Sequence, residues 1–154
     1  MASLAKIDSE RITIELGPGT GSITAQLLNS GLPQKNLYCV EFDPKMCEII
    51  KRKFPEINVI NSSAENLGEL FAGKSRNICA IVSSLPLLSL PKGVSEKILS
   101  ECQNILPQGA RFIQFTYNLN RAPDEVGFTK MRPVECAKVY ANLPPARVDA
   151  FEKL

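Results

Sequence analysis

The chain has 154 residues, 44% of them hydrophobic, and a formal net charge of +2 at pH 7. These values predict one globular domain over residues 1–154 and argue against a protein that depends on wrapping duplex nucleic acid. The absence of histidine excludes a Ser-His-Asp or Cys-His nucleophile and the usual kind of metal site, and five scattered cysteines predict reduced thiols in a cytoplasmic protein.

The first predicted elements are a strand, a glycine-rich turn and a helix. Residues 11–15 are apolar and β-branched, as in a buried strand, and residues 21–30 have the apolar spacing of a helix. Between them, residues 15–21 read Glu-Leu-Gly-Pro-Gly-Thr-Gly. Glycines allow backbone conformations and a close approach that a Cβ forbids, and a helix start offers unpaired N–H groups. The segment therefore predicts a cradle for a nucleotide-like ligand.

Glu15 indicates which ligand this is. A dinucleotide site brings its glycines close to a pyrophosphate, and an anion just before the glycines opposes that. A carboxylate suits a cationic ligand instead, such as S-adenosylmethionine with its ammonium and sulfonium groups. A P-loop is excluded because no Gly-Lys-Ser/Thr follows. A nicotinamide dinucleotide stays as the less favoured alternative.

The second predicted strand, residues 37–41, ends on Glu41. Asp43 and Pro44 then have the residue types of an N-cap and a first helical position, which predicts a helix over 44–53. An acid at the tip of this strand is placed to accept hydrogen bonds from both ribose hydroxyls of the ligand. A solvated loop residue is the alternative for Glu41. Phe42 is expected to lie against the adenine face.

The rest of the chain continues the alternation of strand and helix. Strands are predicted over 57–60, 78–82 and 111–117, with a helix over 93–105. After a loop and a short helix, residues 137–142 and 147–151 have the pattern of two further strands. This order predicts an α/β, Rossmann-like fold: a mostly parallel sheet of about seven strands, an antiparallel C-terminal hairpin at one edge, and helices on both faces.

Ligands of such sheets bind beyond the carboxyl ends of the strands, which predicts further site residues. Ser63 or Glu65 is expected to reach the adenine amino group while Ala64 leaves room for the ring, and a plain helix N-cap is the equal alternative for this loop. Ser83 ends the fourth strand at the expected cleft, with a plain turn as the alternative. The predicted cofactor-binding residues are Glu15, Gly17, Gly19, Thr20, Gly21, Glu41, Phe42, Ser63, Ala64, Glu65 and Ser83.

The glycine motif, Glu41 and the alternation resemble the class I S-adenosylmethionine-dependent methyltransferases. Residues 82–91, 112–117 and 142–146 (Val-Ser-Ser-Leu-Pro-Leu-Leu-Ser-Leu-Pro, Phe-Ile-Gln-Phe-Thr-Tyr and Asn-Leu-Pro-Pro-Ala) are similar to the bacterial phospholipid N-methyltransferases, relatives of the ribosomal RNA adenine dimethylases. The resemblance implies stepwise methylation of phosphatidylethanolamine toward phosphatidylcholine, with S-adenosyl-L-methionine as cofactor and a phospholipid at a membrane surface as partner. An RNA or small-amine methyltransferase, or an inactive domain with this fold, are the alternatives.

Several residues depart from the patterns of these families. Many class I enzymes have Asp where this chain has Ser63, and many have Asp where it has Asn77. RNA adenine dimethylases carry an amide and an aromatic residue at the end of the fourth strand, to bind and stack the flipped base. Residues 84–87, Ser-Leu-Pro-Leu, lack both, so the sequence disfavours nucleic acid as a substrate.

The implied reaction is an in-line displacement in which the enzyme chiefly aligns an amine with the sulfonium methyl group. Ser83 and Tyr117 are the candidates to position the amine, although Tyr117 is equally well read as an ordinary strand-end aromatic. Arg121, Lys130, Arg132 and Arg147 either attract anionic headgroups or lie on a solvated face, and the solvated face is the favoured reading.

The start of the chain differs from the resembled lipid enzymes. Those enzymes have an N-terminal helical segment ahead of the first strand, and residues 1–7 read as the end of such a helix. We therefore expect this chain to lack that segment and to bind its cofactor weakly. No apolar stretch reaches the roughly 18 residues of a membrane span. The expected location is the cytoplasm, peripheral on the inner face of the cell membrane.

Overall fold

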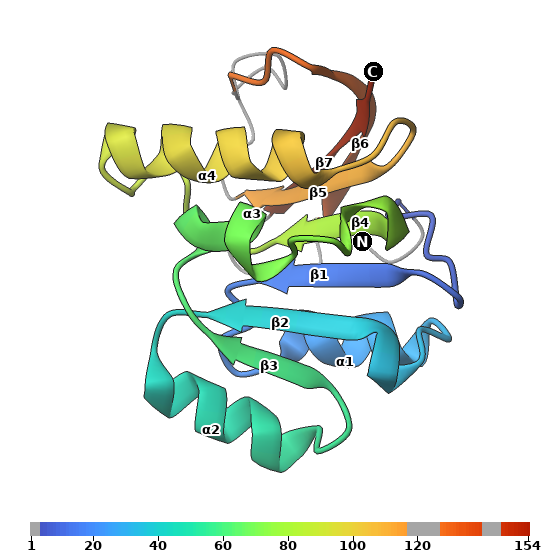
Figure 1. Ribbon diagram of the computed structural model, residues 1–154, viewed down its shortest axis with the longest axis vertical. Helices are drawn as coiled ribbons and strands as arrows, with labels where there is room; N and C mark the ends of the chain where they lie inside the picture. The colour runs from blue at the N-terminus through green and yellow to red at the C-terminus, as the bar shows by residue number, and fades with distance from the viewer. Residues whose placement is uncertain (1–3, 117–126, 140–145) are drawn as a thin grey trace.

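The computed structural model describes residues 4–116, 127–139 and 146–154. Within them, seven strands form one sheet in the order β3-β2-β1-β4-β5-β7-β6 (Figure 1). The strands are β1 (Ile12–Leu16), β2 (Leu37–Glu41), β3 (Asn58–Asn61), β4 (Ile78–Ser83), β5 (Arg111–Thr116), β6 (Met131–Val139) and β7 (Ala146–Lys153). Strands β1 to β5 are parallel, whereas β7 is antiparallel to both β5 and β6. The predicted mostly parallel sheet with an antiparallel C-terminal hairpin at one edge is confirmed.

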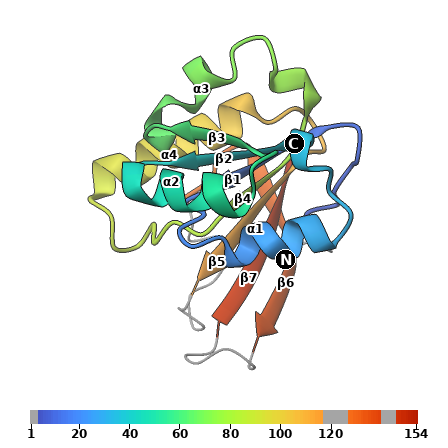
Figure 2. The same cartoon turned by 90° about the horizontal axis from the view of Figure 1, so that it is seen from below.

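Helices cover both faces of this sheet (Figures 1 and 2). Helices α1 (Ser22–Asn29) and α2 (Pro44–Lys53) pack on one face, through a core that includes Leu27 and Ile50. The short α3 (Leu67–Leu70) and the longer α4 (Lys92–Ile105) pack on the other face, in a second core. Short 3-10 helices are η1 (Gln34–Asn36), η2 (Ala64–Asn66) and η3 (Ser75–Asn77). The connections with helices between parallel strands bring the carboxyl ends of β1 to β5 to one edge.

Strand β1 shows how the sequence assigns side chains to the two faces. Successive residues of a strand point to opposite sides of the sheet. Ile14 and Leu16 belong to the core under α3 and α4, so Glu15 between them points toward the face that α1 and α2 cover. All five residues of β1 are buried, as expected for a strand in the middle of a sheet with helices on both sides.

The C-terminal hairpin is the part of the fold that the sequence predicted least well. The strand predicted over 137–142 coincides with β6 at residues 137–139, but β6 begins earlier, at Met131, and residues 140–142 lie outside the described part. Pro133 lacks the N–H that a central strand needs, but it is tolerated in an edge strand or at a bulge. Strand β6 is the edge of the sheet, and its register with β7 shifts between Pro133 and Glu135. The expected short helix is not found in residues 127–139, and residues 117–126 lie outside the described part.

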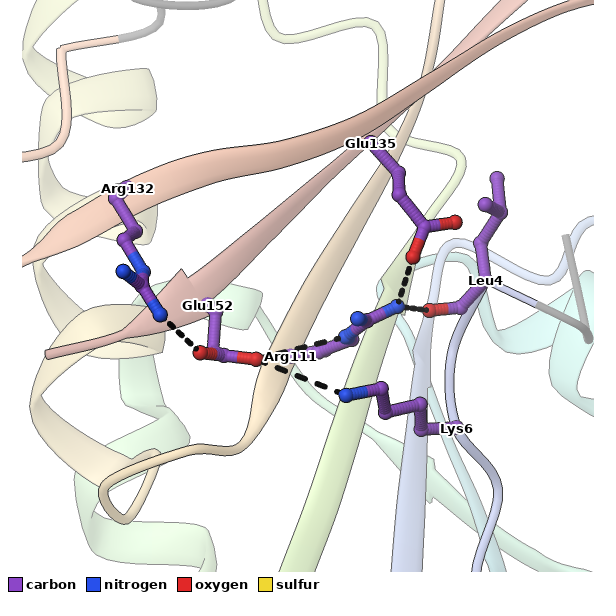
Figure 3. A network of polar contacts seen from close by, with 6 residues as sticks. All are labelled: Leu4, Lys6, Arg111, Arg132, Glu135 and Glu152. Carbon is purple, nitrogen blue, oxygen red and sulfur yellow. Dashed lines mark hydrogen bonds and ion pairs between the residues drawn. The ribbon is translucent and has the colours of Figure 1, made fainter.

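Arg111, the first residue of β5, joins the N-terminal segment to the C-terminal strands. It is 5% exposed, and its Nη1 donates to the Leu4 carbonyl oxygen at 2.7 Å and to Glu135 Oε1 at 3.1 Å. The whole polar network comprises Leu4, Lys6, Arg111, Arg132, Glu135 and Glu152 (Figure 3). It lies at the end of the sheet away from the carboxyl ends of the parallel strands. Residues 4–6 form a turn, and no helix is found in the described residues before β1.

Candidate functional site

The glycine turn between β1 and α1 combines three residues with positive φ. The φ angles of Gly17, Gly19 and Gly21 are 66°, 53° and 86°, values that favour glycine. A Cβ on Gly17 would lie 2.6 Å from Leu85 Cδ2, and one on Gly21 would lie 2.8 Å from the Phe54 ring. A Cβ on Gly19 would have nothing within 4 Å. Gly17 and Gly21 therefore allow close packing within the protein, whereas Gly19 presents bare backbone to open space.

Glu15 is fully buried beneath this turn. Its Oε2 accepts hydrogen bonds from Thr24 Oγ1 at 2.7 Å and from Cys39 Sγ at 3.4 Å. Burial raises the pKa of the Glu15 carboxyl to about 7, because the low-dielectric interior disfavours the charged form. Burial also raises the pKa of the Cys39 thiol, which keeps its proton and can donate it to Glu15. Glu15 Oε1 has no hydrogen-bond partner.

Glu41 lies against the glycine turn, and its ribose role stays a prediction. Glu41 Oε2 accepts a hydrogen bond from the Gly19 N–H at 3.3 Å, and Oε1 accepts one from the Asp43 N–H at 3.0 Å. Phe42, the next residue, is 77% exposed. The Ser62 N–H donates to the Glu41 carbonyl oxygen at 3.0 Å, so the loop after β3 also lies beside Glu41.

In the loop after β3, Ser63 caps a short helix. Its Oγ accepts a hydrogen bond from the Glu65 N–H at 3.2 Å and donates to Glu65 Oε2 at 3.1 Å. Ala64 is buried in the core under α3 and α4. The helix N-cap, which was the equal alternative for this loop, is therefore observed. Contact of these residues with an adenine ring stays a prediction.

The loop after β4 forms one wall of a cavity of about 660 Å³. Ser84 to Leu90 line this wall, and residues of α4 line another. The strands contribute a third side of the cavity, the floor, which consists of Gln114, Phe115 and Thr116 of β5 with Arg147 and Asp149 of β7. Because Leu85 lies against Gly17, the cavity adjoins the glycine turn.

Ser83 does not line this cavity, although its neighbour Ser84 does. Ser83 is fully buried, and its Oγ accepts a hydrogen bond from the Leu85 N–H at 3.3 Å. A role for Ser83 in binding the cofactor or positioning a substrate stays a prediction. Tyr117, the other candidate, lies outside the described residues.

The floor carries polar residues that the sequence analysis missed. Gln114 and Asp149 are directly opposite each other in the antiparallel pairing of β5 with β7, and both are buried. Arg147 is only 4% exposed and donates from Nε and Nη2 to Asp149 Oδ2 at 3.0 and 2.7 Å. The solvated-face reading was therefore wrong for Arg147, whereas Lys130 and Arg132 are exposed and Arg121 lies outside the described residues. A polar residue inside an apolar strand, as in residues 112–115 and 148–151, was the available signal.

Two further properties concern the described residues as a whole. They contain no group of three metal-ligating side chains placed to hold an ion. No helix among them has the length and apolar character needed to cross a bilayer.

Comparison with known proteins gives one family and several relatives. Residues 14–109 match the model of a family described as a methyltransferase domain. The ornithine lipid N-methyltransferase of Singulisphaera acidiphila is 24% identical over 113 residues, which cover 71% of this chain and 59% of that protein. The ribosomal RNA small subunit methyltransferase A of Clostridium botulinum is 26% identical over 101 residues, which cover 64% of this chain and 36% of that protein. The chain thus spans less than two thirds of either relative.

Solved structures share the fold. TrmN from Thermus thermophilus superposes with a TM-score of 0.78 at 19% identity, over 99% of this chain and 46% of that one. The N-methyltransferase NodS from Bradyrhizobium japonicum, in complex with S-adenosyl-L-homocysteine, superposes with a TM-score of 0.72 at 12% identity, over 93% of this chain and 78% of that one. The Rossmann-like fold predicted from the alternating elements is confirmed.

Proposed function

This chain belongs to the methyltransferase domain family. From that premise we propose that it is an S-adenosylmethionine-dependent methyltransferase, and that it methylates the amine of phosphatidylethanolamine, toward phosphatidylcholine. One observation carries the proposal. The cavity that adjoins the glycine turn has a leucine-rich wall over a floor with unpaired buried oxygen atoms. Such a cavity fits a molecule with an apolar body and a polar head that donates hydrogen bonds.

The cofactor is proposed to lie over the glycine turn. Gly19 offers bare backbone beside open space, and Glu41 stands at the tip of β2 with its carboxylate against that backbone. This geometry supports Glu41 as the acceptor for the ribose hydroxyls. Glu15 is fully buried beneath the turn, which supports an electrostatic influence on the cationic end of the ligand in place of direct contact. When bound, S-adenosylmethionine supplies an electrophilic methyl group that the lone pair of a neutral amine attacks, with departure of the neutral thioether.

The lipid character of the acceptor rests on the loop of residues 84–90. Leu85, Leu87, Leu88 and Leu90 are all in this loop and all line the cavity. Leu88 is 52% exposed, so the wall continues into apolar surface at the outside of the protein. An apolar rim of this kind supports contact with the acyl region of a bilayer. The similarity to an ornithine lipid N-methyltransferase supports the same class of acceptor.

RNA is the second candidate acceptor, because the chain is also similar to a ribosomal RNA methyltransferase. Residues 84–87 offer leucine and proline where the stacking of an extruded base needs an aromatic side chain. This composition favours the lipid over the RNA.

The test is methyl transfer from S-adenosylmethionine labelled in its methyl group. The purified full chain is incubated with vesicles that contain phosphatidylethanolamine, with vesicles of phosphatidylglycerol alone, and with ribosomal RNA. We expect label in the lipid fraction of the first sample only. Label in RNA, with none in phosphatidylethanolamine, would overturn the proposed acceptor.

A further inference from the structure

We infer that Gln114, Asp149 and Ser84 form the site that holds the acceptor amine by its N–H groups, and that this site selects primary and secondary amines over tertiary ones. The inference rests on the proposed function for the identity of the acceptor, and it deepens that function by naming the residues and the kind of amine. It comes from three buried oxygen atoms that lack hydrogen-bond partners and belong to residues that line one cavity.

Gln114 presents an acceptor because its amide nitrogen is already engaged. Gln114 Nε2 donates to the Leu85 carbonyl oxygen at 3.0 Å and to the Phe115 carbonyl oxygen at 2.7 Å. A flipped amide would place its oxygen against these two carbonyl oxygens, so the network fixes the orientation. Gln114 Oε1 is buried without a partner. The bond to Leu85 also joins this residue to the loop that touches Gly17.

Asp149 presents a second acceptor beside the first. The residue is 1% exposed, and Arg147 Nε and Nη2 both donate to Oδ2, whereas Oδ1 has no hydrogen-bond partner. Cys136 is its register partner on β6, and burial, followed by the influence of Asp149, raises the pKa of the Cys136 thiol. A thiol is a weak donor, so an amine N–H makes the stronger bond to this carboxylate.

Ser84 adds a third group at the wall of the cavity. Its Oγ is buried and has no hydrogen-bond partner, although its N–H donates to the Leu16 carbonyl oxygen at 3.0 Å. A buried hydroxyl without a partner is costly. A polar group of a ligand relieves that cost.

The two floor oxygens, Gln114 Oε1 and Asp149 Oδ1, match the two N–H groups of a neutral primary amine, and the Ser84 hydroxyl is a further polar contact for the headgroup. Such an amine has two N–H groups for two acceptor oxygens and one lone pair for the methyl group. The Arg147 guanidinium offsets the charge of Asp149, so the site does not strongly favour the ammonium form, which has no lone pair to react. In each transfer the lone pair forms the new N–C bond, the C–S bond breaks with its electrons staying on sulfur, and the extra N–H proton of the product leaves to water. Each transfer replaces one N–H group by an N-methyl group. A neutral tertiary amine therefore has no N–H group to donate to the floor oxygens.

The experiment uses the full chain and phospholipids with short, matched acyl chains. Calorimetry in the presence of S-adenosyl-L-homocysteine measures the binding of phosphatidylethanolamine, its N-methyl and N,N-dimethyl derivatives, and phosphatidylglycerol. Steady-state kinetics gives KM and kcat for the same amines. The variants are Asp149→Asn, Ser84→Ala and, as a matched charge control on the surface of α2, Glu48→Gln. Ser84→Ala removes an unpartnered hydroxyl and is therefore not expected to unfold the protein, even if Asp149→Asn does.

We expect the wild type to bind phosphatidylethanolamine at least about 10-fold more tightly than phosphatidylglycerol, and to bind the dimethyl derivative more weakly than either less methylated amine. Asp149→Asn should raise KM for phosphatidylethanolamine about 10-fold or more and Ser84→Ala about 3-fold or more, with S-adenosyl-L-homocysteine affinity unchanged. Glu48→Gln should leave both quantities unchanged.

Two results would overturn the inference: equal binding of the two headgroups by the wild type, or an unchanged KM in every variant of the site that folds. Equal rates on all three amines would remove the proposed selectivity. Binding of phosphatidylethanolamine through these residues without methylation would instead contradict the proposed function. The inference that these residues bind the amine would then still hold.

Discussion

The side chain of Leu85 lies so close to Gly17 that a Cβ there would be 2.6 Å from Leu85 Cδ2. Gly17 belongs to the turn that follows β1, and Leu85 belongs to the loop that lines the cavity. The contact joins the proposed cofactor cradle to the proposed acceptor site. A displacement of one segment therefore displaces the other, because closely packed atoms leave no free space between them.

Gly17→Ala is expected to destabilise the protein and to weaken cofactor binding. Its positive φ costs an alanine about 1–2 kcal/mol, and the overlap with Leu85 adds about 1–3 kcal/mol. Gly109→Ala is the matched control, because Gly109 also has a positive φ, of 77°, but its added Cβ would have nothing within 4 Å. Chemical denaturation measures both variants. Equal losses of stability in the two would show that the approach of Leu85 does not constrain residue 17.

Glu15 is expected to make the folded state less stable as the pH rises. Its folded pKa of about 7 exceeds the ordinary value of 4.5, so between these values the folded state binds more proton than the unfolded state. The linkage relation then makes stability fall as pH rises through this window, by about 3 kcal/mol in total, with little further loss above pH 7. Unfolding free energies of the wild type and Glu15→Gln, measured across the window, test this. The variant should show a flatter profile, and parallel profiles would contradict the raised pKa.

Glu41→Gln is expected to weaken binding of S-adenosylmethionine. A neutral amide makes weaker hydrogen bonds to ribose hydroxyls than a carboxylate, and the loss of about 1.5–3 kcal/mol corresponds to about a 10- to 100-fold rise in Kd. The control is Glu48→Gln, which removes a charge from the exposed surface of the neighbouring α2. Calorimetric titration gives the Kd values. If Glu41→Gln binds as tightly as this control, the ribose role of Glu41 is wrong.

Arg111→Met is expected to loosen the N-terminal segment. The variant loses the bonds from the buried guanidinium to Leu4 and Glu135, at a cost of about 1–3 kcal/mol. Arg132→Met is the comparison, because the Arg132 side chain that pairs with Glu152 is itself 61% exposed. Thermal unfolding and hydrogen exchange at residues 4–10 should change more in the first variant than in the second. The opposite order would show that Arg111 does not anchor the segment.

Most of the fold is predictable because its signals are local. The glycine turn, the capping pair Asp43 and Pro44, and the apolar runs of β1 and β4 each specify an element within a few residues. The start of β6 was not predictable in the same way, since Pro133 is acceptable only because that strand is at the edge of the sheet. The order of the strands decides whether β6 is an edge strand, and that order depends on the whole chain.

The residues of the candidate site also differ in whether a local signal in the sequence identifies them. Glu15, Glu41 and the glycines were found because each sits at a strand end next to a recognisable turn. Gln114 and Asp149 were missed because their importance comes from the pairing of β5 with β7 and from the face on which they lie. No local pattern in the sequence contains that pairing. The buried state of Arg147 has the same origin, since an arginine alone gives no sign that an aspartate two residues away binds it.

A crystal structure with S-adenosyl-L-homocysteine and short-chain phosphatidylethanolamine tests the central claim most directly. The account predicts the ribose hydroxyls on Glu41, the thioether sulfur facing the cavity, and the amine nitrogen within hydrogen-bond distance of Asp149 Oδ1 and Gln114 Oε1. A nucleoside bound away from Glu41, or a lipid amine that contacts neither floor residue, would contradict it.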